Sequence, residues 1–367
     1  MDVYRNLVRP LLFRLPPETA HHATIEACRV GARVPGVRSL GRRWLGFDDR
    51  LHTTVAGLTF PNPIGLAAGW DKSGRASRAL DALGFGFAEI GSVSARASKG
   101  NPKPRLFRVP DEEALIVNYG LPNEGVDAVA KRLACLRSQI PIGVNIVKTN
   151  DGPGIPVGSD DEIFEDYVDS VSRVHTRAGY LMLNLSCPNA DGGKDFFAIQ
   201  GNIQRLLEAL RSISMASPVF LKLPPTQEPR VHDRWLSECD PFAFVRGFMF
   251  NLCPGKPDWL KWEHTSSHSI RSPGAVAGPP IADWFLGCIA SLSRRMDRDR
   301  YALFGGGGIR TADDAWNQII HGASLVQIYS ALIYQGPAVT RRLCRGLAEK
   351  MTRHGFQSLQ EAVGSGL

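Results

Sequence analysis

Eight short apolar runs, each followed by a stretch of helical character, constrain the fold of this chain more than any other feature. They lie at 63–67, 87–91, 143–147, 181–185, 219–223, 247–250, 301–304 and 325–328. Apolar strands that alternate with helices indicate a parallel sheet covered on both faces. Eight such units close most naturally into a (β/α)8 TIM barrel. A doubly wound sheet is the alternative, but no GxGxxG motif opens a first strand–helix unit.

Three further segments lie outside or between these units. Residues 53–60 alternate around Gly57 and predict a hairpin before the barrel, at its bottom. We expect an N-terminal helical extension over 1–40 and a barrel domain over 41–367. Long loops in compact enzymes are often lids or substrate walls, which is the role we expect for the insertions 92–141 and 253–280.

The N-terminal segment combines apolar residues and arginines near helical spacing. The apolar residues are Tyr4, Leu7, Val8, Leu11, Leu12 and Leu15, and the arginines are Arg5, Arg9 and Arg14. This pattern is typical of a helix that lies on a membrane surface, with Pro10 either kinking it or starting a new helix. A helix docked on its own domain is the alternative. No run of 18 apolar residues and no signal-peptide pattern occurs, so we expect no membrane-spanning segment.

The net charge and the cysteines limit the classes of ligand and the cellular compartment that we expect for this protein. The net charge of +7 suits an anionic ligand or membrane, and nucleic acid is set aside because the basic residues are dispersed and no binding motif accompanies them. The seven cysteines are odd in number and form no CxxC, which argues against disulfides and zinc and favours a reducing cytosol. His264 and His268 have ligand-like spacing but no third ligand nearby, so we expect no metal site.

Polar residues recur at the carboxyl ends of the predicted strands, where barrel enzymes place their active sites. Buried amides and ammonium groups are costly unless a partner satisfies them, and a planar polar ligand would do so. The set comprises Lys72, Ser92, Asn145, Asn184, Ser186, Cys187, Asn189, Lys222, Asn251, the glycines 305–308, Tyr329 and Ser330.

The glycine run after the seventh strand predicts a phosphate site. In LFGGGGIRTADDA, backbone N–H groups of the loop and the N-terminus of the next helix would together hold a phosphate. A flexible glycine turn is the alternative. The position just before GASLVQIYSALIYQGP favours the phosphate site.

Six segments resemble one known family. GLAAGWDKSG (65–74), GFGFAEIGSV (84–93), GNPKPRLFR (100–108), NLSCPN (184–189), FGGGGI (304–309) and GASLVQIYS (322–330) are similar to dihydroorotate dehydrogenases, and the resemblance runs over nearly the whole chain. Residues 4–24 resemble the N-terminal helices of the quinone-linked, membrane-associated class 2, where they form the quinone tunnel. The resemblance implies FMN-dependent oxidation of a C–C bond next to a carbonyl, quinone as electron acceptor, and a cytoplasmic protein peripherally associated with the inner membrane.

The resemblance also implies residue roles. The FMN-binding set is Ala68, Gly69, Lys72, Ser92, Asn145, Asn184, Lys222, Gly278, Gly307, Tyr329 and Ser330. The substrate-binding set is Lys72, Asn184, Asn189 and Asn251, and the catalytic pair is Cys187, as general base, with Lys72. A thiol, with an ordinary pKa of about 8.5, can serve as a base near neutral pH. A small buried apolar residue is the alternative reading of Cys187.

Some positions depart from the family pattern. Class 2 normally has serine at Cys187, and both this cysteine and GLPNEG (120–125) resemble the soluble class, which leaves a soluble electron acceptor open. In the substrate pocket, Val117 replaces an asparagine, Leu252 replaces serine or threonine, and Phe250 replaces a small hydroxyl residue. Asn118 could restore the first amide by a one-residue shift.

Three hypotheses follow: a dihydroorotate dehydrogenase, a paralogue that desaturates a less polar small molecule, and a flavin-binding protein without catalysis. The retained lysine, amides and thiol argue against the third.

Overall fold

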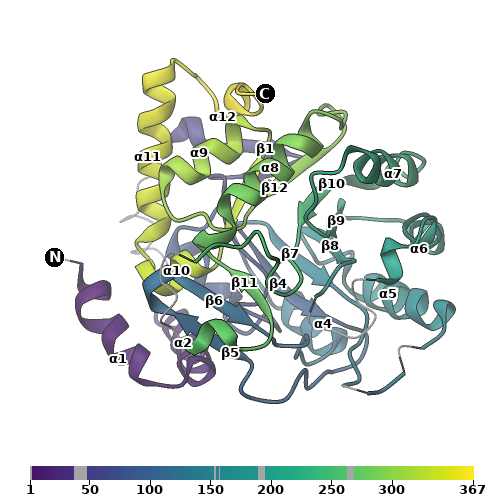
Figure 1. The fold of residues 1–367 in the computed structure, drawn as a ribbon, viewed down its shortest axis with the longest axis horizontal. Helices are drawn as coiled ribbons and strands as arrows, with labels where there is room; N and C mark the ends of the chain where they lie inside the picture. The colour runs from purple at the N-terminus through teal and green to yellow at the C-terminus, as the bar shows by residue number, and fades with distance from the viewer. Residues whose placement is uncertain (1, 37–47, 153, 157, 189–194, 263–267) are drawn as a thin grey trace.

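The computed structural model describes residues 2–36, 48–152, 154–156, 158–188, 195–262 and 268–367. Their main feature is a closed barrel of eight parallel strands, which confirms the predicted TIM barrel (Figure 1). In chain order the strands are β3 (Ile64–Leu66), β4 (Phe87–Val93), β7 (Ile142–Ile146), β8 (Tyr180–Asn184), β9 (Val219–Leu223), β10 (Val245–Phe250), β12 (Ala302–Gly305) and β13 (Leu325–Ile328). Each predicted run overlaps one of them.

Helices cover the outside of the barrel. They are α4 (Val126–Ala134), α5 (Asp160–Val174), α6 (Asn202–Leu210), α7 (Pro229–Cys239), α8 (Ala282–Ser293), α9 (Ala312–Ile320), α10 (Ser330–Gln335), α11 (Val339–His354) and α12 (Leu359–Ala362). Short turns of 3-10 helix connect the elements: η2 (Asp49–Leu51), η3 (Ser77–Ala79), η4 (Asp81–Leu83), η5 (Pro110–Glu112), η6 (Phe196–Ala198), η7 (His268–Arg271) and η8 (Pro279–Ile281). None of the helices in these ranges is long and apolar enough to cross a bilayer.

The predicted hairpin closes the bottom of the barrel. Strands β1 (Thr53–Val55) and β2 (Leu58–Phe60) pair antiparallel around Gly57, whose φ of +79° suits a tight turn. The Phe60 ring packs edge-to-face on Phe87 at 5.5 Å, within an aromatic cluster from the strands of the barrel. The carboxyl ends of the strands are therefore the face that carries the site.

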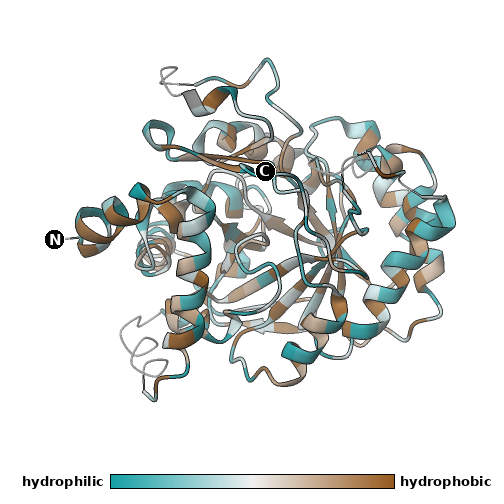
Figure 2. Cartoon of the chain, turned by 90° about the horizontal axis from the view of Figure 1, so that it is seen from below, coloured by the Kyte–Doolittle hydropathy of each residue, from teal (hydrophilic) through white to brown (hydrophobic). Residues whose placement is uncertain are grey.

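The N-terminal extension is helical and lies along one side of the barrel. A π-helical turn η1 (Tyr4–Val8) leads into α1 (Arg9–Arg14) and α2 (Pro17–Gly31), so Pro10 starts a new helix. Figure 2 shows these helices projecting beyond the outline of the barrel, with apolar stretches on their surface. Leu7 and Leu11 are 58% and 62% exposed. The proposed boundary at residue 40 lies outside the described residues and stays a prediction.

The two long insertions form a small sheet, where we expected loops. Strands β5 (Leu106–Val109) and β6 (Ala114–Val117) come from the first insertion and β11 (Ala275–Ala277) from the second. They pair antiparallel in the order β11-β6-β5, with Ala275 opposite Val117. Each strand is too short to show an alternating pattern, and β6 pairs with a strand far away in sequence, so local patterns could not reveal the sheet.

Candidate active site

A cavity lies where the carboxyl ends of the strands meet the small sheet. It has about 1130 Å³ of space between its atoms, open mouth included, which suffices for a nucleotide-sized ligand and a small substrate. Its wall contains nearly all of the predicted site residues: Ala68, Gly69, Lys72, Ser92, Asn184, Cys187, Lys222, Asn251, Gly278, Gly307, Tyr329 and Ser330. Their individual roles stay predictions.

Two predicted residues are not on this wall. Asn145 on β7 is fully buried one layer beneath it, where its Oδ1 accepts from Ser92 Oγ at 2.5 Å and its Nδ2 donates to Glu89 Oε1 at 2.8 Å. Asn145 therefore supports cavity residues from below. Asn189 lies outside the described residues.

Glu89 on β4 was missed by the sequence analysis. Its carboxylate is 1% exposed and accepts from Lys222 Nζ at 3.3 Å and from Gln327 Nε2 at 2.9 Å, in addition to Asn145. A buried charge must be paired and hydrogen-bonded, and these contacts fix three polar side chains of the site in one network. A single glutamate inside the apolar run 87–91 was the available signal.

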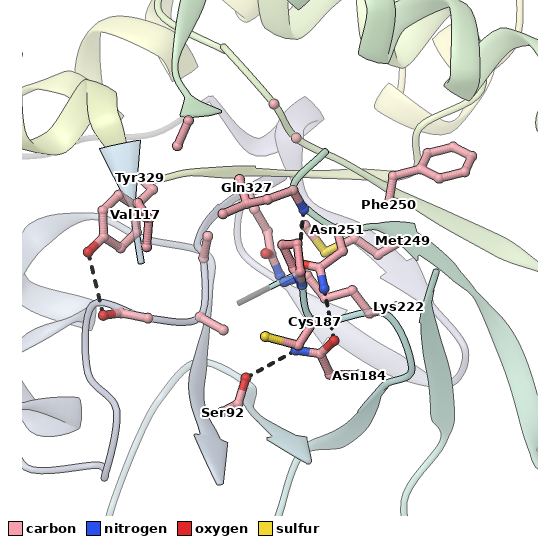
Figure 3. A pocket seen from close by; sticks show the side chains of 18 of the residues that line it. Ser92, Val117, Asn184, Cys187, Lys222, Met249, Phe250, Asn251, Gln327 and Tyr329 are labelled. Carbon is pink, nitrogen blue, oxygen red and sulfur yellow. Dashed lines mark hydrogen bonds between the residues drawn. The ribbon is translucent and has the colours of Figure 1, made fainter. Parts of the chain in front are cut away.

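A chain of hydrogen bonds orders the amides on the cavity wall. Asn251 Nδ2 donates to Asn184 Oδ1 at 2.8 Å, and Asn184 Nδ2 donates to Ser92 Oγ at 3.2 Å (Figure 3). Ser92 is on β4, Asn184 is on β8 and Asn251 follows β10, so three different strands of the barrel fix the orientation of these groups before a ligand binds. Such preorganisation reduces the entropy lost on binding.

The predicted phosphate site differs from our expectation at the N-terminus of α9. Thr311 and Asp314 form a capping box at the start of α9, so the N-terminus of that helix is already occupied by side chains. The glycine loop before it is on the cavity wall, and Gly307 and Gly308 have φ of +74° and +85°. Within the described part of the chain, the N–H groups of these two glycines bind no other residue. In the predicted phosphate site, the loop rather than the helix therefore offers these N–H groups to a ligand.

The remaining polar atoms fit a planar cofactor that carries N–H groups. Gln327 Oε1 is buried without a partner on the cavity wall, so it can accept from a ligand. Lys222, whose Nζ donates to Glu89 at 3.3 Å, lines the same cavity and has further N–H groups for a ligand. A flavin mononucleotide satisfies these groups and the glycine loop together.

Cys187 and Lys72, the predicted catalytic pair, both line the cavity. Cys187 is 5% exposed and lines the cavity close to the Asn184 amide (Figure 3). Lys72 Nζ is 3.1 Å from His21 Nε2 and 3.9 Å from the centre of the Tyr119 ring. Burial lowers the pKa of Lys72 to about 7. The lysine can therefore gain or lose a proton near neutral pH.

One wall of the cavity is apolar where the family pattern is polar. Val117 and Leu252 both line it, while Asn118 is not on the wall and accepts a hydrogen bond from Asn101 Nδ2 at 3.2 Å. Asn118 therefore does not restore the lost amide. Figure 3 shows Val117 beside Tyr329 and the Phe250 ring turned away at the other end of the site, where it packs 6.2 Å from His232.

A barrel that presents a glycine phosphate loop, an ordered row of amides and a thiol to one cavity has the architecture of a flavin-dependent oxidoreductase. Comparison with known proteins makes the assignment specific. The family described as dihydroorotate dehydrogenase matches residues 50–351. The chain belongs to this family, and it is an FMN-dependent oxidoreductase that acts on a CH–CH bond.

Relatives match over the full length. The chain is 41% identical over 365 residues to "Dihydroorotate dehydrogenase (quinone)" of Mycobacterium tuberculosis, covering 98% of this chain and 97% of the relative. It is 37% identical over 368 residues to the protein of the same name from Halobacterium salinarum, covering 98% and 99%. A crystal structure of the Eimeria tenella enzyme in complex with ferulenol superposes with a TM-score of 0.79 at 27% identity, covering 95% of each chain.

A glycine substitution tests the phosphate cradle. In Gly307→Ala the new Cβ would lie 2.4 Å from the Phe285 ring, so the loop must move and FMN content should fall to a small fraction of one per chain. The matched control is Gly355→Ala, which has a similar φ of +78° and open space around its Cβ. FMN released by denaturation is measured by absorbance. Full FMN content in Gly307→Ala would place the phosphate elsewhere.

Proposed function

We propose that the protein oxidises the C–C bond next to a carbonyl in a small ring substrate, and that this substrate has a polar edge like that of dihydroorotate and a less polar opposite edge. The observation that carries the proposal is the mixed wall of the cavity. Asn184, Asn251 and Lys72 line it, and so do Val117 and Leu252, which pack in one apolar cluster.

In this proposal Cys187 removes the proton from the carbon next to the carbonyl, and the amides and Lys72 hold the substrate's oxygens. When bound, FMN would supply the hydride acceptor for the neighbouring carbon. Ser92 and Asn184, supported by Asn145, hold the cofactor and the substrate in a fixed relative position. Lys222 stabilises negative charge on the cofactor. The cavity's apolar residues exclude water from the reacting atoms.

The second candidate substrate is dihydroorotate itself. The names of relatives that match the whole chain favour it. If dihydroorotate is the substrate, the cavity must bind its polar ring edge without two polar side chains. Val117 stands in place of an asparagine, and Leu252 stands in place of serine or threonine. Anaerobic flavin reduction by dihydroorotate decides between the two candidates.

We further propose quinone as the electron acceptor, bound in a second cavity between the N-terminal helices and the barrel. This cavity has about 800 Å³ of space and is mostly apolar, with a wall that includes Leu12, Phe13, Ala20, Leu106 and Leu332. An apolar pocket of this kind suits a lipophilic ring and its tail. The names of the relatives also support a quinone.

Membrane contact through the same helices is part of this proposal. Val3, Leu7, Val8, Leu11 and Leu15 are 40% or more exposed, and Arg14 beside them is exposed as well. An apolar surface flanked by arginines favours the interface of an anionic bilayer. The protein would then act from the cytoplasmic face of the inner membrane.

The double variant Leu7→Asp with Leu11→Asp tests both the quinone as electron acceptor and the membrane contact of the N-terminal helices. Each lost leucine removes about 1.5–3 kcal/mol of burial, so binding to anionic vesicles should fall more than about tenfold. Reduction of a long-chain quinone in those vesicles should fall with it, while flavin reduction by substrate is unchanged.

The matched control is Ile155→Asp with Ile199→Asp, which alters two apolar residues that are 51% and 60% exposed elsewhere. Cosedimentation measures binding, and stopped-flow absorbance measures the flavin. Unchanged reduction of vesicle-borne quinone by the leucine variant would contradict the proposal and favour a soluble acceptor.

A further inference from the structure

A hydrogen bond joins a side chain on the wall of the apolar cavity to a side chain on the wall of the active-site cavity. His21, on α2, lines the apolar cavity, and Lys72 lines the active-site cavity. The His21 Nε2 and Lys72 Nζ atoms are 3.1 Å apart. A residue of the N-terminal extension is therefore in direct contact with a residue of the substrate site.

Neighbouring contacts fix the position of α2 at this point. Glu18, one turn before His21, forms an ion pair of 2.8 Å with Arg105, and the two side chains are only 13% and 8% exposed. The Arg105 guanidinium also lies 5.5 Å from the centre of the Tyr119 ring, the ring that Lys72 contacts at 3.9 Å. The helix cannot slide or rotate without breaking a buried ion pair, so the imidazole is held against the ammonium.

The charges around the pair decide which partner donates. Burial, followed by the charges of Lys72 and His22, holds the pKa of His21 well below its usual range, so the imidazole is neutral. A neutral imidazole nitrogen can accept a hydrogen bond from the ammonium and thereby favours the charged form of the lysine. Around Lys72, burial and Arg105 disfavour its charge, while Glu18 and Asp71 favour it.

We propose that His21 is a positioning residue for Lys72, which it holds as an ammonium directed into the active-site cavity. The N-terminal extension then takes part in substrate oxidation as well as in electron transfer to the acceptor. The inference rests on the proposed function only in taking Lys72 as a group that contacts substrate and cofactor.

The first test titrates Lys72 without any substrate. The full-length, FMN-loaded protein is labelled briefly with acetic anhydride over a range of pH, and mass spectrometry of the Lys72 peptide follows the neutral amine. In His21→Leu the ammonium loses its acceptor, so the labelling curve should shift to lower pH by about one unit, a tenfold change in the proton affinity of the amine. In His21→Gln the amide oxygen can still accept, and the curve should stay closer to that of the wild type.

The matched control is His22→Leu, the adjacent histidine, whose side chain is 62% exposed and is directed to Glu18. Its Lys72 curve should stay within a few tenths of a unit of the wild-type curve. FMN content and thermal melting confirm that each variant is folded. An unchanged Lys72 curve in folded His21→Leu would overturn the proposal.

The second test measures anaerobic flavin reduction against pH with whichever substrate reduces the wild type. The limb that reports Lys72 should move to lower pH in His21→Leu and recover in His21→Gln. A uniform loss of rate with an unshifted profile would mean a structural role only, and would overturn the proposal. Failure of dihydroorotate as a substrate bears on the proposed function alone, because the labelling experiment needs no turnover.

Discussion

Cys187→Ala should bind FMN as fully as the wild type yet reduce it about 10²–10⁴ times more slowly with the true substrate, because general-base catalysis commonly contributes that much. The thiol lies on the cavity wall close to the ordered amides, where a base is needed. Its removal leaves the hydrogen bonds of Asn184 and Asn251 in place. The loss should therefore appear in the rate of flavin reduction and only weakly in substrate affinity.

Cys187→Ser is the conservative variant. It should retain part of the activity with an optimum at higher pH, because a hydroxyl is a much weaker acid than a thiol. Stopped-flow absorbance of the flavin under anaerobic conditions measures both variants, and Cys344→Ala, at a buried thiol away from the cavity, is the control. Flavin reduction at the wild-type rate in Cys187→Ala would assign the base to another residue.

The wild type should be reduced slowly by dihydroorotate, and Val117→Asn combined with Leu252→Thr should be reduced more efficiently by a factor of about 30 or more. A polar substrate edge left without a partner costs about 1–3 kcal/mol per group, so two restored hydrogen bonds give a gain of this size. Both residues line the cavity, and the neighbouring Asn118 is engaged by Asn101.

The measured quantity is the second-order rate constant of flavin reduction at low dihydroorotate concentration. Ala277→Ser adds a hydroxyl to the same wall at neither of the two altered positions, and it should give no such gain. Fast reduction of the wild type by dihydroorotate would refute the altered substrate and leave dihydroorotate as the substrate.

Features that depend on local sequence were predictable. The eight strands are continuous apolar runs, and the hairpin around Gly57 follows from alternation and a glycine turn, so both could be predicted. Most of the cavity wall was predictable as well, because the carboxyl ends of parallel strands converge on one face.

Features that depend on distant contacts were not. The sheet of β5, β6 and β11 requires two insertions to meet, and the contact between His21 and Lys72 requires α2 to dock beside the barrel. We expected the N-terminus of α9 to take part in the phosphate site, although the capping residues Thr311 and Asp314 are visible in the sequence. Glu89 was overlooked because an apolar run was interpreted as a whole.

The strand β6 has a consequence for inhibition. Leu115 on this strand lines the apolar cavity, and Val117, two residues further on, lines the active-site cavity, while none of the residues that the structure describes lines both. Both side chains point to the same face of the strand, so the two compartments follow one another along β6. A compound that fills the apolar compartment does not compete with the oxidised substrate for space, so raising the substrate concentration cannot displace it. Potency against this protein can thus be developed in one compartment without imitating the molecule that is turned over in the other.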